Sequence, residues 1–304
     1  MRARGLVAGA AMLLLAAIIG VSTAPSAPPV GASAAATVAA STSGTVSAAT
    51  SSGTPAAATS AARKASATSA PTPAAAPLTV VGLGDSIESG YHCDCTNFVA
   101  EVAQRIGDAQ GRPVKLANRA VPGAVTQDVL DQLTATETRQ TVAASDLVIV
   151  EIGANDFAAG AADLYRPECL PDQGGTCFAA TEASMRRNLD SIVAQVRGLQ
   201  TRPGAQVVVL GYWNVFVDGA VGRAQGDTYV AGADQVSQRV NRAAVEVAAQ
   251  HGVVYADAYA PFKGDGSRDD TPLLADDGEH PDAAGHAALA EAVLGALGPR
   301  ALQL

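Results

Sequence analysis

Hydrophobic residues gather in short, nearly continuous runs beyond residue 77, and longer amphipathic stretches separate these runs. Runs rich in Val, Ile and Leu predict buried strands over 78–82, 114–118, 146–153, 205–211 and 252–256. Apolar positions that recur with helical spacing predict helices over 97–106, 126–133, 180–199, 231–250 and 282–297. Thr96 is the expected N-cap of the first helix and Gly107 its expected end. Strands and helices therefore alternate along the whole segment.

This alternation indicates an α/β fold. Uninterrupted apolar strands are typical of a parallel sheet that helices cover on both faces, because neither face of the strand then meets water. We therefore expect one α/β domain over residues 78–304, built on a five-stranded parallel sheet. Ligands of such sheets bind beyond the carboxyl ends of the strands, so we searched there first for chemically active residues.

The first 24 residues have the pattern of a secretory signal peptide. Two arginines precede the apolar run Leu6–Gly20, and small residues offer cleavage after Ala24 or as late as Ala34. The apolar run is shorter than the ~20 residues of a membrane span. We expect a secreted protein without stable membrane insertion; an uncleaved N-terminal anchor is the alternative.

Residues 25–77 consist almost wholly of Ala, Ser, Thr, Pro and Gly, which predicts a disordered linker because such a segment has too little apolar surface to fold. Only four of the chain's 20 lysines and arginines lie before residue 78, so 16 of them accompany all 29 acidic residues in the remainder. That excess of negative charge argues against nucleic acid or an anionic membrane as partner and is compatible with small neutral or cationic substrates. We expect a monomer.

The four cysteines are Cys93, Cys95, Cys169 and Cys177, and all of them follow the linker. An even number behind an export signal suggests two disulfides. Three pairings are possible, and the sequence favours Cys169–Cys177 only weakly, because this bond would close a short loop rich in Pro and Gly. The spacings CxC and Cx7C are unusual for zinc.

Four segments carry candidate chemistry, and each also fits an ordinary turn or helix cap when taken alone. They are Gly82–Ser86, Asn118–Thr126, Gly153–Asp156 and Asp277–Pro281. The first three follow predicted strands. Together they supply a serine hydroxyl, a histidine base with a carboxylate three residues before it, and donors for an oxyanion, which are the parts of a serine hydrolase.

In this order the four segments resemble the four sequence blocks of the SGNH (GDSL) hydrolases. Ser86, Gly123, Asn155 and His280 match the residues that name the family, and the first block reads GDSI instead of GDSL. The resemblance covers about residues 80–297 and extends to secreted actinobacterial members. It implies a flavodoxin-like three-layer α/β/α sandwich, ester hydrolysis, and no metal or organic cofactor.

The resemblance also implies a role for each matched residue. Ser86 is the nucleophile, His280 the general base and acid, and Asp277 the carboxylate that orients His280. The Ser86 N–H, the Gly123 N–H and the side-chain amide of Asn155 form the oxyanion hole. Asp85 is expected to shape the nucleophile turn.

The remaining histidines and the single tryptophan are weaker candidates for a functional role. His286 and His251 are expected to be structural, His92 could line the mouth of the site, and Trp213 fits core packing better than an acyl pocket. Two alternatives to the serine esterase stay open. They are a non-catalytic cell-wall or glycan-binding domain on the same fold, and a metal-dependent hydrolase using Asp276, Asp277, His280 and His286. For the esterase we favour short acyl groups or acetylated glycans, with lipids as a further option.

Overall fold

The structure is a computed structural model that describes residues 75–304. The predicted signal peptide (1–24) and nearly all of the linker (25–77) lie outside the described residues, so both stay predictions. Five parallel strands form one sheet in the order β2-β1-β3-β4-β5. They are β1 (Leu78–Gly84), β2 (Val114–Asn118), β3 (Leu147–Glu151), β4 (Gln206–Leu210) and β5 (Val254–Ala256). The predicted five-stranded parallel sheet is confirmed.

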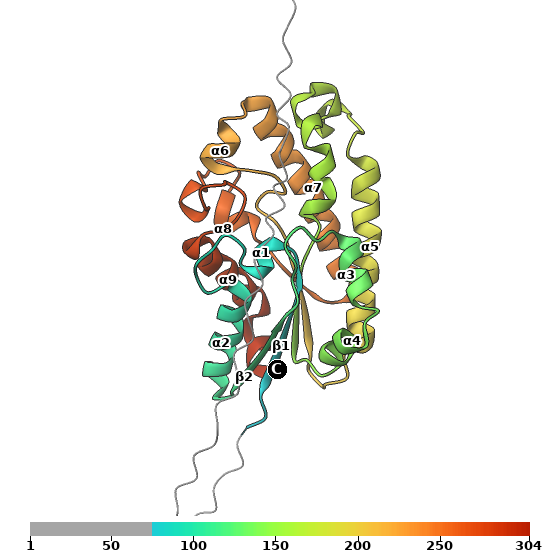
Figure 1. The fold of residues 1–304 in the computed structure, drawn as a ribbon, viewed down its shortest axis with the longest axis vertical. Coiled ribbons are helices and arrows are strands. Elements are labelled where there is room, and N and C mark those ends of the chain that lie inside the picture. Colours follow the sequence, from blue (N-terminus) through green and yellow to red (C-terminus); the bar gives the residue numbers. More distant parts are fainter. Residues whose placement is uncertain (1–74) are drawn as a thin grey trace, which may run out of the picture. The chain divides into compact units, whose positions relative to one another are not determined.

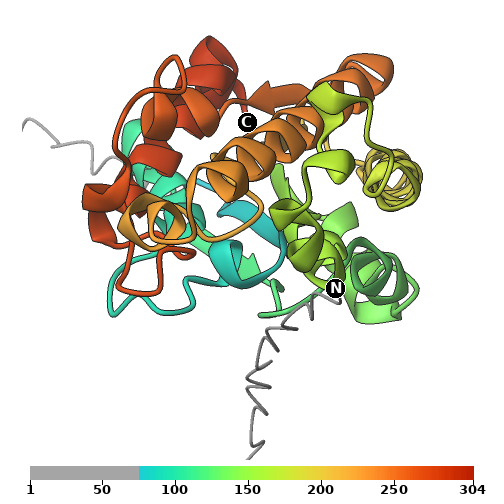
Figure 2. The ribbon, with the colours of Figure 1, turned by 90° about the horizontal axis from the view of Figure 1, so that it is seen from above.

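Helices cover both faces of this sheet (Figure 1). One layer holds α2 (Phe98–Gln110) and α9 (Ala283–Leu297), which pack on each other. The opposite layer holds α3 (Thr126–Gln132), α4 (Thr136–Ala143), α5 (Ala179–Leu199) and α7 (Asp227–His251). Seen from above in Figure 2, the short cyan helix α1 lies between the orange-red and the green-yellow helices. Among residues 75–304 no helix has both the length and the apolar character needed to cross a membrane.

Shorter helical segments connect these elements. They are α1 (Ser86–Ser89), α6 (Gly219–Arg223), α8 (Tyr259–Lys263) and the 3-10 helices η1 (Ala154–Tyr165), η2 (Pro167–Cys169), η3 (Pro171–Gln173), η4 (Thr271–Leu273) and η5 (Gly298–Gln303). Three of them, α1, η1 and α6, follow strands β1, β3 and β4 along the chain. Of the predicted site residues, Ser86 lies in α1 and Asn155 in η1, whereas Asp277 and His280 follow η4.

Strands β1 and β3 lie inside the sheet and are buried along their whole length, because helices cover both of their faces. The edge strands β2 and β5 keep partly exposed residues. The loops after β1 and β3 therefore begin at strands that are buried and paired on both sides.

The two predicted limits of helix α2 were wrong. Asn97, not Thr96, is the N-cap, since its side chain accepts a hydrogen bond from the backbone N–H three residues on at 2.9 Å. The helix also continues through Gly107. That glycine is needed inside the helix because a Cβ there would overlap Val114 of β2. The chain leaves the helix at Gly111, whose φ of 62° is easily adopted only by glycine.

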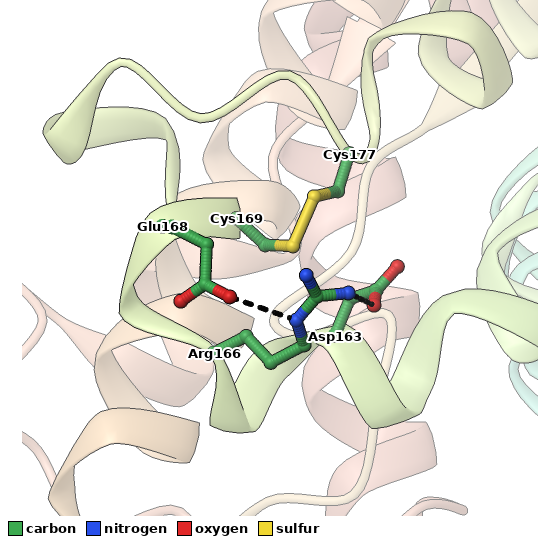
Figure 3. Close-up of a disulfide and its surroundings, with 5 residues drawn as sticks. All are labelled: Asp163, Arg166, Glu168, Cys169 and Cys177. Carbon is green, nitrogen blue, oxygen red and sulfur yellow. Dashed lines mark hydrogen bonds and ion pairs between the residues drawn. A yellow bond between two sulfur atoms is a disulfide. The ribbon is translucent and has the colours of Figure 1, made fainter.

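Both disulfides are present, and they join Cys93 to Cys95 and Cys169 to Cys177. This is the pairing that the sequence favoured weakly. Figure 3 shows Cys169, which is fully buried, bonded across its loop to Cys177. Arg166 pairs with two carboxylates of the same loop beside this bond. The disulfide thereby fastens the chain that leaves η1 to the start of α5.

Candidate active site

Ser86 lies directly after β1, as the first residue of helix α1. Asp85 caps this helix: one side-chain oxygen accepts the Ile87 N–H at 3.1 Å, and the other accepts the Tyr212 hydroxyl at 3.0 Å. Ser86 is 9% exposed, and its hydroxyl forms no hydrogen bond to any residue of the described part. The turn therefore presents an unoccupied hydroxyl at the carboxyl edge of the sheet.

Asp277 and His280 form the predicted pair. The Asp277 Oδ2 lies 2.7 Å from the His280 Nδ1, and Oδ1 accepts the N–H groups of Glu279 and His280 at 2.9 and 3.0 Å. Partial burial works to raise the pKa of Asp277, but these three hydrogen bonds outweigh it and hold that pKa below its usual value. An ionised Asp277 keeps the proton of a neutral His280 on Nδ1, which leaves Nε2 as an acceptor.

The turn that carries this pair is anchored by backbone hydrogen bonds. The Ala275 N–H donates to the His280 carbonyl at 2.8 Å, and the Asp218 N–H donates to the Gly278 carbonyl at 2.6 Å. Asp276 is exposed, and its carboxylate forms no hydrogen bond or ion pair with another described residue. Of the two neighbouring aspartates, only Asp277 faces the histidine.

Tyr91 connects the serine turn to the histidine. Its backbone N–H donates to the Ser86 carbonyl at 3.0 Å, and the centre of its ring lies 5.2 Å from that of His280. His92 stacks on His280 with 5.4 Å between ring centres. A protonated His280 would also lower the pKa of Asp85, next to Ser86. These contacts bring the first and the fourth block to one place. From the sequence, His92 was expected at the mouth of the site and Tyr91 was not.

The oxyanion donors predicted from the second and third blocks lie side by side. Gly123 has a φ of 81° and is exposed, and its N–H donates to no residue of the described part, so this N–H is open to a ligand. Asn155 donates one amide N–H to the Ala124 carbonyl at 3.0 Å. An amide nitrogen carries two hydrogens, so a second donor remains for an oxyanion.

Asp156 holds these two segments together, and the sequence analysis had treated it only as a turn residue. Its carboxylate accepts the Thr126 N–H at 2.9 Å and the Thr126 hydroxyl at 2.6 Å. Asn188 of α5 donates to the same hydroxyl at 3.0 Å. Because Thr126 follows the Gly123 loop directly, Asp156 holds that loop next to the segment that bears Asn155.

Three carboxyl groups that the sequence analysis did not connect lie buried under the nucleophile. They belong to Asp85, Glu88 and Glu151. Burial raises the pKa of Asp85 to about 6, and burial raises the pKa of both glutamates well above the usual value. No backbone N–H donates to the carboxyl group of Glu151. Burial at the base of the site therefore favours the protonated form of the two glutamates.

A pocket of about 380 Å³ opens beside Asn155. Alanines of η1, the segment Val215–Val217 and two tyrosines form most of its wall, and Glu279 and Gln225 complete it. One of the tyrosines, Tyr165, is 50% exposed at the rim. The walls are thus mainly apolar and begin at the oxyanion hole.

Two other hollows are less suited to the chemistry. One of about 550 Å³ lies along α7 and β5, is larger than the pocket at Asn155, and contains none of the predicted catalytic residues. A groove of about 380 Å³ is lined by Gly123 itself, by Val121 and by the carboxylates Asp128 and Asp131. The pocket at Asn155 and this groove each contain one of the predicted oxyanion donors, but the groove carries two carboxylates, whereas the wall of the pocket is mainly apolar.

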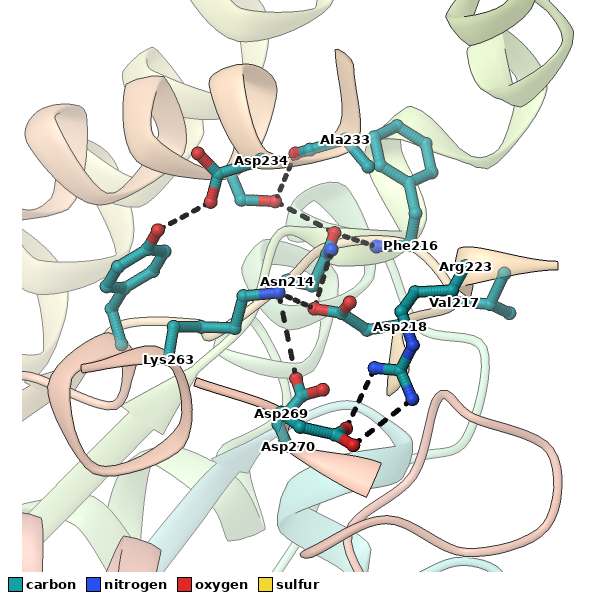
Figure 4. A network of polar contacts seen from close by, with 12 residues as sticks. Asn214, Phe216, Val217, Asp218, Arg223, Ala233, Asp234, Lys263, Asp269 and Asp270 are labelled. Carbon is teal, nitrogen blue, oxygen red and sulfur yellow. Dashed lines mark hydrogen bonds and ion pairs between the residues drawn. The ribbon is translucent and has the colours of Figure 1, made fainter. Parts of the chain in front are cut away.

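A buried ion pair supports the catalytic turn and the pocket wall (Figure 4). Lys263 Nζ lies 2.6 Å from the Asp218 Oδ2, which also accepts the Asn214 amide at 2.9 Å. The Phe216 N–H donates to Asn214 at 3.0 Å. Burial, followed by the nearby Asp218 charge, raises the pKa of Asp270 to about 7. The ion pair thus connects the backbone of the pocket wall with Asp218, whose N–H anchors the catalytic turn.

The other residues named from the sequence lie outside the site. His286 is buried in α9, where its Nδ1 accepts the Phe98 N–H, and burial lowers its pKa to about 4. His251 ends α7 and lies 2.8 Å from Asp190. Trp213 stacks on Phe262 in the core and does not line the pocket at Asn155. The contacts of these three side chains therefore indicate a structural role.

Two groups within residues 75–304 bring three atoms able to ligate a metal within 4.8 Å of one another. Each contains a disulfide, whose sulfurs are not thiolate ligands. The groups are Cys93, Cys95 and His286, and Asp163, Cys169 and Cys177. The set of the metal alternative, Asp276, Asp277, His280 and His286, forms no such group in the described part of the chain.

Comparison with known proteins identifies the family. The chain belongs to the GDSL-like lipase/acylhydrolase family, whose model matches residues 83–288. This range begins before Ser86 and ends beyond His280, so it contains the first block from Leu83 onward and the other three blocks completely. No curated protein sequence matches the chain.

Solved structures agree with the fold. A lipase from a goat rumen metagenome has 20% sequence identity and a TM-score of 0.59, over 72% of this chain and 97% of that one. A variant of an acetyl xylan esterase from Geobacillus stearothermophilus has 18% identity and a TM-score of 0.51, over 74% and 96%. The predicted α/β fold of SGNH hydrolases is thereby confirmed.

Proposed function

We propose that this protein is a secreted serine ester hydrolase that works through an acyl-enzyme on Ser86. The observation that carries the proposal is the Asp277–His280 pair, 2.7 Å apart, on a turn that Tyr91 links to the nucleophile. An ionised carboxylate on Nδ1 is what an imidazole needs to act as a base through Nε2.

In the acylation step, the Ser86 Oγ attacks the ester carbonyl carbon while its proton moves to the His280 Nε2. The carbonyl oxygen becomes an oxyanion, and the N–H groups of Ser86 and Gly123 and the free amide hydrogen of Asn155 donate to it. The tetrahedral intermediate then collapses, its bond to the alcohol oxygen breaks, and His280 returns the proton to that oxygen. Asp277 stabilises the imidazolium that exists between the two transfers.

Deacylation repeats these steps with water. His280 takes a proton from the water, the hydroxide adds to the acyl carbon, and the bond to Ser86 breaks. His280 then protonates the Ser86 Oγ, and the carboxylic acid leaves. Catalytic hydrogen bonds are often long before substrate binds, so the absence of a bond at the Ser86 hydroxyl is compatible with this role.

The pocket beside Asn155 favours an acyl group of short to medium length. Its apolar wall starts at the oxyanion donor, so an acyl chain extending from the carbonyl carbon enters it directly. The rumen lipase and the acetyl xylan esterase with this fold both cleave esters, as their names state. We favour soluble esters, including acylated glycans, over triglycerides. The two disulfides accord with export, since such bonds persist in oxidising surroundings.

The test is ester turnover by the full chain and by Ser86→Ala. We expect the substitution to lower kcat by at least ~10³-fold with little change in thermal unfolding, because it removes only the covalent route. The substrates are ethyl esters from acetate to dodecanoate, and EDTA is present in parallel assays. Turnover that survives in Ser86→Ala would refute the assignment of Ser86 as the nucleophile. Loss of parent activity in EDTA would favour the metal alternative, and absence of turnover with all esters would favour a binding domain.

A further inference from the structure

Tyr91 and His92 form an exposed aromatic pair against the catalytic histidine. Their rings lie 4.6 Å apart, and both rings contact that of His280. Tyr91 is 48% exposed although it packs on a buried residue. Neither side chain lines the apolar pocket beside Asn155. The pair is therefore a second surface of the site, separate from the acyl pocket.

The backbone holds this pair in an uncommon conformation. Within residues 75–304, His92 is the one residue other than glycine with a positive φ, at 62°. Such a conformation persists only where its surroundings hold it, and it occurs often at functional sites. Here the Cys93–Cys95 disulfide follows His92 directly, and the Asn97 amide donates to the Ser89 carbonyl at 3.2 Å. The loop is pinned on both sides of the aromatic pair.

The chemistry of ester cleavage assigns the two surfaces to different parts of a substrate. The carbonyl oxygen points to the donors on Gly123 and Asn155, and the acyl pocket begins at Asn155. The leaving alcohol receives its proton from His280, so its oxygen must depart next to the imidazole. Tyr91 and His92 are the aromatic side chains that contact this imidazole.

From this arrangement, which rests on the proposed function, we infer that Tyr91 and His92 bind the alcohol part of the ester and select alcohols that carry a ring, such as sugars. An exposed aromatic face offers a flat apolar platform to the face of a ring, and the adjacent imidazole offers a polar group to its hydroxyls. A flexible linear alcohol would cover less of such a platform and lose more conformational freedom on binding.

The groove that Gly123 itself lines is the competing place for the alcohol. It is lined by Val121, which is 48% exposed, and by Asp128 and Asp131. This groove does not contact His280, so an alcohol there would lie away from the proton donor. If the alcohol binds to the aromatic pair, substitution of Tyr91 should change the preference among alcohols. If it binds in the groove, substitution of Val121 should change that preference instead.

The experiment compares Tyr91→Ala with Tyr165→Ala, two tyrosines of nearly equal exposure on the two surfaces. Substrates are the butanoate esters of hexanol, cyclohexanol and methyl glucoside, together with the acetate and hexanoate esters of methyl glucoside. We expect Tyr91→Ala to lower kcat/KM for the glucoside ester relative to the hexyl ester by about 3–10-fold, the usual worth of one aromatic contact. Tyr165→Ala should change the preference among acyl groups and leave the preference among alcohols unaltered. Tyr91→Phe should keep the parent's preference.

Rapid-quench measurements separate this specificity from a merely structural role. Alcohol release in the first turnover reports acylation, and release of the acid from the acyl-enzyme, after the alcohol has left, reports deacylation. We expect Tyr91→Ala to slow only acylation, and most for ring alcohols. Equal slowing of both steps for every alcohol would overturn the inference, since Tyr91 would then only support His280. Altered alcohol preference in Val121→Ala but not in Tyr91→Ala would overturn it as well. Absence of a Ser86-dependent first turnover in the parent would instead refute the proposed function.

Discussion

The catalytic turn and the base of the nucleophile loop both hold carboxyl groups near one edge of the sheet, but backbone donors favour ionisation much more at Asp277 than at Glu151. Asp277 accepts two backbone N–H groups and the His280 ring, and its pKa lies below the usual value. Glu151 is fully buried, no backbone N–H donates to its carboxyl group, and burial holds its pKa well above the usual value.

This difference shows how one fold keeps some carboxyl groups charged and others neutral. Burial opposes ionisation at both places, and hydrogen-bond donors or an opposite charge beside the carboxylate can reverse that effect. Asp85 stands between the two cases, because it accepts the Ile87 N–H and the Tyr212 hydroxyl and has a pKa of about 6. Of these three carboxyl groups, Asp277 is the one whose pKa its surroundings hold below the usual value.

The largest effect should follow removal of the charge on Asp277. We expect Asp277→Asn to lower turnover of a short-chain ester roughly 10–10³-fold, because the imidazole could take the wrong tautomer and its protonated form would lose support. Asp276→Asn is the matched control and should cost less than about 3-fold, since Asp276 is exposed. Equal losses at both positions, or sensitivity of the parent to EDTA, would contradict the role of Asp277 as the carboxylate that orients His280.

A smaller effect, of opposite sign, should appear at the buried cluster. A carboxyl whose pKa is raised in the folded state keeps a proton that the unfolded chain loses above its ordinary pKa of 4.5, so its burial costs more stability as the pH rises from there. Glu151→Gln removes this cost. We expect it to stabilise the fold by at least about 1 kcal/mol at pH 8 and to change little at pH 4.

Thermal unfolding at the two pH values measures this stabilisation. Glu137→Gln is the control, because Glu137 pairs with Arg119 at the surface and this hydrogen bond lowers its pKa. It should bring no gain at pH 8. Should Glu151→Gln destabilise the protein equally at both pH values, the carboxyl would be ionised and paired, contrary to the comparison above.

The sequence predicted the sheet because its signal lies in continuous apolar runs, which burial on both faces requires. It predicted helix limits less well. Gly107 was taken as a helix end, whereas its close contact with Val114 of β2 is a tertiary effect that no local pattern reveals. Helix α4 was missed because it buries only Thr138 and Val142 and so lacks a clear apolar stripe.

The candidate site was predictable where its residues fall in recognisable blocks. Asp277 and His280 are three residues apart, so their contact could be expected from spacing alone. The contact of Tyr91 with His280 joins positions far apart in the chain, and the hydrogen bond from the Glu151 N–H to Glu88 depends on the register of β1 and β3. Such contacts exist only once the strands are paired, which is why the aromatic pair and the acidic cluster could not be predicted.

The most direct test of the account is the position of a covalent adduct. The parent protein is treated with a fluorophosphonate, which reacts with activated serines, and the labelled peptide is identified by mass spectrometry. We predict one adduct per chain, on Ser86, forming at least ~10-fold more slowly in Asp277→Asn at neutral pH because the serine then lacks an oriented base. An adduct on any other residue, or none in a protein that hydrolyses esters, would contradict the assignment of Ser86 as the nucleophile.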